Sequence, residues 1–154
     1  MKKTIITLFL CVFSLSLFAQ TENDYIEVVR SVLKTEKKAV IAEVMELTEA
    51  ESGPFWELYN EYDFELSKVQ NIRLNAIKEY ADEYGILTDE KADALWSQVM
   101  DFKTASLKLE KSYYKKFKKI LPAAKAAKYF QAENKIEAMV AASIAVQVPM
   151  IIED

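Results

Sequence analysis

The sequence has no histidine, one cysteine, two glycines and three prolines among its 154 residues. The absence of histidine excludes Ser-His-Asp catalysis and any histidine general base. The scarcity of Gly and Pro indicates long, uninterrupted helices joined by few turns. About half of the residues are apolar and 29% are charged, so we expect a single globular domain.

The first nineteen residues have the pattern of a cleaved signal peptide. Lys2 and Lys3 precede an apolar run over 5–18, and Ala19 is a small residue at the cleavage position. The run is about 15 residues long, short of the ~20 that span a bilayer. A retained membrane anchor is therefore the weaker alternative. We predict an exported, periplasmic protein whose mature domain, residues 20–154, has no stable membrane anchor.

Cleavage at this point removes Cys11, the only cysteine. The mature chain then has no disulfide, no thiol nucleophile and no Cys/His zinc site. Carboxylate, lysine and tyrosine chemistry remain, and these account for a small part of known catalysis. We predict a protein that is not an enzyme and that binds no cofactor or metal.

Apolar residues recur at helical spacing in four segments, and strand signals are absent. The predicted helices cover about 24–45, 48–84, 88–120 and 122–146. In the second and third, the apolar steps alternate between four and three, as in coiled-coil-like packing. Short loops favour an antiparallel hairpin of these two helices, each roughly 45–50 Å long. We predict an all-α fold that is elongated and thin, and a thin fold favours burial in a homodimer.

Two features of the second helix conflict with this pattern. Gly53-Pro54 implies either that the helix begins at Ser52, or that it begins after Thr48 and bends. Arg73 interrupts the apolar stripe, so we expect a carboxylate partner from the facing helix. A surface Arg with its stem lying on apolar neighbours is the alternative.

Three helix starts resemble one another. In each, a leucine precedes a cap or first-turn residue, and a large apolar pair follows eight and nine positions later. Thr48 and Glu51 have the spacing of a capping box, and the tryptophans are expected to bury against an adjacent helix. The residues with this mainly structural role are Leu47, Thr48, Glu51, Trp56, Leu87, Thr88, Trp96, Leu121, Pro122 and Phe130.

The sequence Leu47-Thr48-Glu49-Ala50-Glu51, followed by Phe55-Trp56, resembles the LTXXQ motif of the Spy/CpxP family of periplasmic stress proteins. It resembles the branch of this family that is common in Bacteroidetes, and the resemblance covers about residues 35–150. The resemblance implies a cradle-like antiparallel dimer of bent helical hairpins. It also implies ATP-independent chaperone activity or inhibition of envelope-stress sensors. The glutamine position of the motif holds Glu51, Lys91 and Lys125 here.

Charge is segregated along the chain. Residues 22–65 carry twelve acids and four bases, whereas residues 103–128 carry nine lysines and one acid, so a strong charge dipole is expected. The basic segment is either a solvated helix face or a patch for acidic clients or a second subunit. With three aromatics at the edges of the apolar stripes, the candidate contact residues are Lys108, Lys111, Tyr114, Lys115, Lys118, Lys119, Phe64 and Tyr84.

Together these features predict a periplasmic, ATP-independent protein-binding chaperone or modulator of the envelope stress response. The expected partners are unfolded proteins or envelope sensors. No Gly-rich phosphate loop is present, and an exported, acidic chain is not expected to bind nucleic acid. The alternative is a dedicated regulatory or structural partner of one envelope protein, without general chaperone activity.

Overall fold

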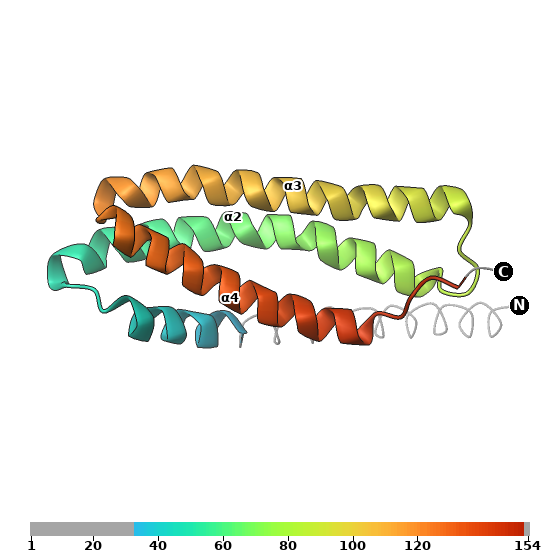
Figure 1. Ribbon diagram of the computed structural model, residues 1–154, viewed down its shortest axis with the longest axis horizontal. Coiled ribbons are helices and arrows are strands. Elements are labelled where there is room, and N and C mark those ends of the chain that lie inside the picture. Colours follow the sequence, from blue (N-terminus) through green and yellow to red (C-terminus); the bar gives the residue numbers. More distant parts are fainter. Residues whose placement is uncertain (1–32, 153–154) are drawn as a thin grey trace, which may run out of the picture. The chain divides into compact units, whose positions relative to one another are not determined.

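The computed structural model describes residues 33–152 (Figure 1). By its internal contacts the chain divides into two compact units, residues 1–43 and 44–154. The predicted signal peptide, with Cys11 and Ala19, lies outside the described residues. None of the described helices is long and apolar enough to cross a bilayer.

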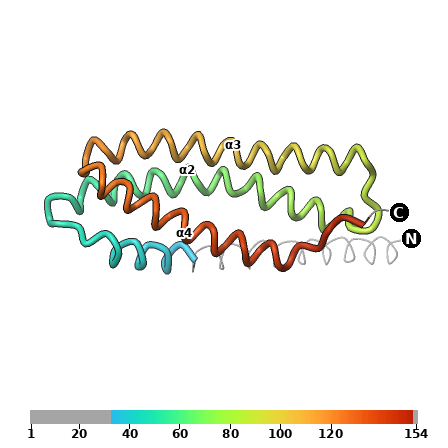
Figure 2. Tube along the Cα trace, in the orientation of Figure 1, coloured from blue at the N-terminus to red at the C-terminus, as the bar shows by residue number. Residues whose placement is uncertain are grey.

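The prediction of an all-α protein is confirmed, since residues 33–152 contain four helical segments and no strand. Residues 33–45 are helical, and the following helices are α2 (Glu49–Asp82), α3 (Asp89–Ile120) and α4 (Ala123–Gln147). Within the second unit, α3 runs back alongside α2, and α4 begins beside the end of α3 (Figure 2). The backbone of α4 approaches α3, whereas side chains alone link α4 to α2.

The start of α2 is set by a capping box. The Thr48 hydroxyl accepts a hydrogen bond from the Glu51 N–H at 3.3 Å, and the Glu51 carboxylate accepts one from the Thr48 N–H at 2.9 Å. Of the two starts that the sequence left open, the structure therefore has the one after Thr48. The helix continues through Gly53 and Pro54, both exposed, although Pro54 removes one backbone hydrogen bond from the second turn.

Thr88 caps α3 by accepting a bond from the Lys91 N–H at 3.3 Å. No reciprocal bond is possible because Lys91 has no acceptor, whereas the Thr48 hydroxyl also donates to Glu51 at 3.0 Å. We expect Thr48→Ala and Thr88→Ala each to cost about 1 kcal/mol, with the larger loss at Thr48. Urea unfolding followed by circular dichroism measures both. A larger loss at Thr88 would contradict the capping-box assignment.

Between α2 and α3 the chain turns at Gly85. Helix α2 ends at Asp82, two residues before its predicted end at Tyr84. Gly85 has a φ of 84°, a left-handed conformation that glycine adopts without steric cost. Beyond the turn, Lys91 and Gln98 of α3 both donate to Glu79 of α2, at 2.5 and 2.7 Å, and hold the two helices together next to the turn.

The core is an aromatic cluster where α2, α3 and α4 meet. Its members are Phe55, Tyr59, Tyr62, Tyr113, Phe117, Tyr129 and Phe130, all at most 5% exposed. Tyr129 is central: its ring centroid lies 4.5 Å from that of Phe117, 4.9 Å from Phe130 and 5.3 Å from Phe55. Burial raises the pKa of Tyr129, so its hydroxyl stays protonated.

The three repeated helix starts contribute unequally to this core. The residue eight positions after each leucine is buried in all three, at Phe55, Leu95 and Tyr129. The ninth is buried at Phe130 but 61% exposed at Trp96. The prediction that the tryptophans bury against an adjacent helix is thus wrong for Trp96, because the aromatic contacts between α3 and α4 occur at Tyr114 and Phe117, four or more turns away.

Arg73 joins three helices. Its guanidinium pairs with Glu137 of α4 at 2.5 Å and lies over the ring of Phe102 of α3, 4.8 Å from the centroid. Gln70 donates to the same carboxylate at 3.5 Å. The expected carboxylate partner is confirmed, although it comes from α4 and not from α3, the helix that packs along α2 in the hairpin. This group is a polar link between α2 and α4 beyond the aromatic cluster.

The oppositely charged segments of the chain meet along the first half of α2. Ion pairs join Glu61 to Lys116 at 2.7 Å and Glu51 to Lys125 at 2.5 Å. Lys125 also donates to the carbonyl oxygen of Glu46, which has a φ of 45°. The hairpin places these acids and lysines beside each other, so part of the charge of the two segments is neutralised within the second unit.

This network gives Glu51 a measurable pH dependence. The bond from Lys125, with those from Thr48, lowers the pKa of the Glu51 carboxyl from 4.5 to about 2. A lowered folded-state pKa stabilises the fold above the unfolded value of 4.5, and that stabilisation is lost as the pH falls toward 2. We expect Glu51→Gln to be less stable than the native protein at about pH 6, and the difference to shrink steadily below about pH 4.5.

Urea unfolding at a series of pH values tests this expectation. Glu49→Gln, in the same helical turn but exposed, is the matched control for a general effect of first-turn carboxylates. A difference between native and Glu51→Gln proteins that stays constant down to about pH 2 would contradict the assignment.

Candidate functional site

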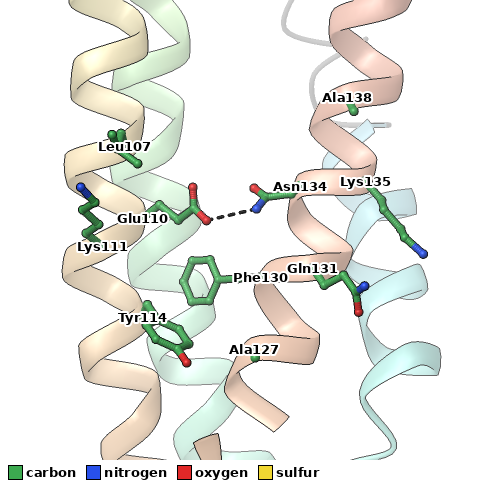
Figure 3. A pocket seen from close by; sticks show the side chains of 10 residues that line it. All are labelled: Leu107, Glu110, Lys111, Tyr114, Ala127, Phe130, Gln131, Asn134, Lys135 and Ala138. Carbon is green, nitrogen blue, oxygen red and sulfur yellow. Dashed lines mark hydrogen bonds between the residues drawn. The ribbon is translucent and has the colours of Figure 1, made fainter. Parts of the chain in front are cut away.

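A groove runs between α3 and α4 in the second unit. It has a volume of about 670 Å³ and is predominantly apolar inside. Four residues of α3 and six of α4 line it (Figure 3): Leu107, Glu110, Lys111, Tyr114, Ala127, Phe130, Gln131, Asn134, Lys135 and Ala138. We call this hollow the α3–α4 groove.

The groove forms where α4 leaves α3 after the aromatic cluster. The Phe130 ring, which lines the groove, packs edge-on against Tyr114, with centroids 5.7 Å apart. Farther along, the Asn134 amide donates to the Glu110 carboxylate at 3.1 Å and ties the two walls together (Figure 3). Ala127 and Ala138 have short side chains on the α4 side, so the walls leave room for a ligand side chain.

The lysines of the basic segment fall into two sets. Lys116 and Lys125 point to acids of α2 and form the ion pairs described above, and Lys128 lies 3.7 Å from the Glu46 carboxylate. The other set is exposed and has no ion-pair partner among residues 33–152. Its members are Lys103 and the five lysines predicted to contact a partner, Lys108, Lys111, Lys115, Lys118 and Lys119.

The predicted aromatic contacts do not gather at one place. Tyr114 lines the α3–α4 groove, and Lys118 lies over its ring, 4.9 Å from the centroid. Phe64 is 60% exposed on α2, with Lys68 over its ring. Tyr84 lines a separate apolar hollow between the ends of α2 and α4. Neither Phe64 nor Tyr84 lines the groove.

A second stripe on α3 extends from the groove toward the start of the helix. We define the α3 stripe as the residues at alternating steps of four and three from Trp96: Trp96, Met100, Lys103, Leu107, Glu110 and Tyr114. Trp96, Met100 and Leu107 are 61%, 45% and 51% exposed, and Lys103 lies over the Trp96 ring. α3 therefore has apolar residues on two faces, one packed in the core and one open.

Of the motif residues, Thr48, Glu51 and Thr88 act in helix caps. Pro122, which was predicted as the first residue of the fourth helix, occupies the N-cap position of α4, and the helix begins one residue later at Ala123. Among these residues only Phe130 lines the groove, and Trp96 lies on the α3 stripe. Sequence analysis did not identify the other groove-lining residues of α4. They are alanines and polar residues, a composition that is also typical of an ordinary exposed helix surface.

No group of three or more His, Cys, Asp and Glu side chains suited to a metal ion occurs in the described part of the chain. No protein-family model, curated protein or solved structure matches this chain. The Spy/CpxP resemblance therefore stays a prediction.

Proposed function

We propose that this chain is a periplasmic, ATP-independent chaperone or stress modulator of the Spy/CpxP type, which binds other proteins at the α3–α4 groove. The observation that carries the proposal is an apolar groove continuous with the open α3 stripe and bordered by lysines without ion-pair partners among residues 33–152. Binding needs neither a nucleotide nor a covalent step. Burial of apolar client surface supplies the free energy, at about 25 cal/mol per Å².

The lysines favour the binding of acidic segments. Exposed, unneutralised ammonium groups attract acidic segments over about one Debye length, ~8–10 Å at moderate salt. The apolar contacts then hold the bound segment. Release follows when a client folds and buries its own apolar side chains, which makes the cycle reversible without an energy source. A homodimer, proposed for the same chain, would place two such grooves in one particle.

A light-scattering assay of an aggregating client tests the proposal. We expect the mature protein, residues 20–154, to suppress aggregation of a reduced model client at a near-stoichiometric ratio. Leu107→Glu, which puts a charge in the groove, is expected to lose most of this activity. The matched control is Ile86→Glu, at a 73% exposed position in the turn between α2 and α3. No suppression at a several-fold excess of native protein would contradict the proposal.

The alternative is a dedicated partner of one envelope protein. A defined groove with a tie between Glu110 and Asn134 also suits a single ligand of fixed shape. In that case a pull-down from envelope extract returns one stoichiometric partner, lost in Leu107→Glu, and the native protein leaves client aggregation unchanged. The two assays together therefore separate the alternatives.

A further inference from the structure

The exposed apolar residues of α3, namely Trp96, Met100 and Leu107, lie on one face of the helix together with Tyr114. Steps of four and three repeat every seven residues, the period at which one helix lies along another in left-handed packing. From Trp96 to Tyr114 the stripe extends over roughly 27 Å at ~1.5 Å per residue, or about five helical turns. An extended strand repeats every two residues and does not match this seam. The open face of α3 is therefore matched to a helix.

The α3–α4 groove continues this seam. Leu107, Glu110 and Tyr114 belong both to the α3 stripe and to the groove lining, so a helix lying on the stripe reaches the groove with one end. In the groove, the short side chains of Ala127 and Ala138 lie on the α4 side, opposite α3 (Figure 3). Large apolar side chains of the ligand helix fit between these alanines and the α3 stripe, as knobs fit into holes.

Charge specifies the flanks of that helix. Lys103 lies within the stripe, and Lys108, Lys111 and Lys115 lie beside it without ion-pair partners in the described part of the chain. A ligand helix whose seam is flanked by Glu or Asp neutralises these ammonium groups. A helix flanked by lysines meets like charges, which disfavours binding by repulsion.

We propose that the α3 stripe and the α3–α4 groove together bind one amphipathic helix of a partner protein, with a heptad apolar seam and acidic flanks. This inference rests on the proposed function and specifies the chemistry of the ligand. A second copy of the chain, or an extended unfolded segment, would be different occupants of the same surface, and the experiment below distinguishes them.

Trp96 provides the readout. The chain has two tryptophans, and Trp56→Phe leaves Trp96 as the sole indole while keeping an aromatic ring at position 56. The indole of Trp96 is 61% exposed, so its burial under a ligand shifts its emission to shorter wavelength. The probes are synthetic peptides of three heptads with Leu at both seam positions. The Glu peptide has Glu at the flanking positions, and the Lys peptide has Lys at the same positions. The scrambled Glu peptide has the residues of the Glu peptide in scrambled order.

We expect a saturable blue shift with the Glu peptide and binding at least about tenfold weaker for the Lys peptide at low salt. The tenfold preference should shrink as salt is raised, because the lysines that produce it are exposed. Leu107→Glu should weaken binding of the Glu peptide by at least about tenfold. Lys111→Glu should reduce the preference for the Glu peptide over the Lys peptide. Ile86→Glu and Lys68→Glu, both away from the stripe, are the matched controls, and circular dichroism verifies that every variant is folded.

Four results would overturn the inference. Equal binding of the ordered and scrambled Glu peptides means that an extended or irregular segment is the ligand. A Trp96 emission that is already blue-shifted and that moves on dilution, together with loss of dimer mass in Leu107→Glu, means that a second copy covers the stripe. Absence of any peptide binding, while the native protein still suppresses client aggregation through Leu107, means that the helix is the wrong ligand but the proposed function holds. If the native protein neither binds the peptides nor suppresses client aggregation, the inference and the proposed function are both contradicted.

Discussion

Phe117→Ala is expected to destabilise the protein by about 3–5 kcal/mol, a large share of the stability of a typical domain. Phe117 is fully buried and its ring contacts those of Phe55, Tyr129 and Phe130, so it touches α2 and α4 from α3. Truncation removes these contacts and leaves a cavity between rigid rings that relax only partly into it. Denaturant unfolding followed at 222 nm measures the loss.

Phe64→Ala is the matched control, because the same atoms are removed from a side chain that is 60% exposed on α2. We expect a change of less than about 0.5 kcal/mol there. Similar losses at the two positions would show that the aromatic cluster is not the core. If Phe117→Ala does not fold at all, Phe117→Leu gives a smaller cavity and keeps the comparison measurable.

The second large effect is expected at the link between Arg73 and Glu137. Arg73→Ala should cost about 2–3 kcal/mol, since it removes the ion pair, the contact with the Phe102 ring and the packing of the side-chain stem. The arginine side chain is 18% exposed and the glutamate 40%, so the pair is partly shielded from water. It is also a long-range contact, joining residues 64 positions apart in the chain.

A double-mutant cycle isolates the ion pair from the other losses. With Arg73→Met, which keeps the stem, and Glu137→Gln, we expect a coupling of about 1–2 kcal/mol. The exposed pair of Lys68 and Glu65 on one turn of α2, 54% and 39% exposed, is the reference and should give about 0.3–0.5 kcal/mol. Equal coupling in the two cycles would contradict a role for Arg73 in holding α4 against α2.

Prediction from sequence was most successful where structure depends on neighbours in the chain. The caps at Thr48 and Thr88 and the turn at Gly85 each depend on a few adjacent residues, and each was found at or within a few residues of its predicted place. The helical spacing of Phe55, Tyr113 and Phe117 likewise marks the side of a helix that faces the core, because burial requires one continuous apolar face. The carboxylate partner of Arg73 was expected for the same reason, since a shielded charge needs a counter-charge.

The candidate site was only partly predictable. Lys111 and Tyr114 were chosen from sequence and line the groove, yet Trp96 was placed in the core and Phe64 and Tyr84 with the contact residues. The error at Trp96 arose because the three helix starts look alike in sequence. The ninth position after the leucine is buried only where another helix covers it, and the repeated motif does not indicate whether such a helix is present.

The sequence by itself determined the all-α class, the caps, the hairpin turn and the inward apolar faces, because these follow from local backbone preferences and from helical periodicity. The tertiary structure decided which lysines are neutralised and which stay open, because ion pairs such as Glu51 with Lys125 join residues 74 positions apart. It also decided that α4 leaves α3 beyond Phe130 and opens the groove. The direction in which one helix leaves another depends on how Phe117, Tyr129 and Phe130 pack together, and packing among distant side chains has no signature in a single sequence.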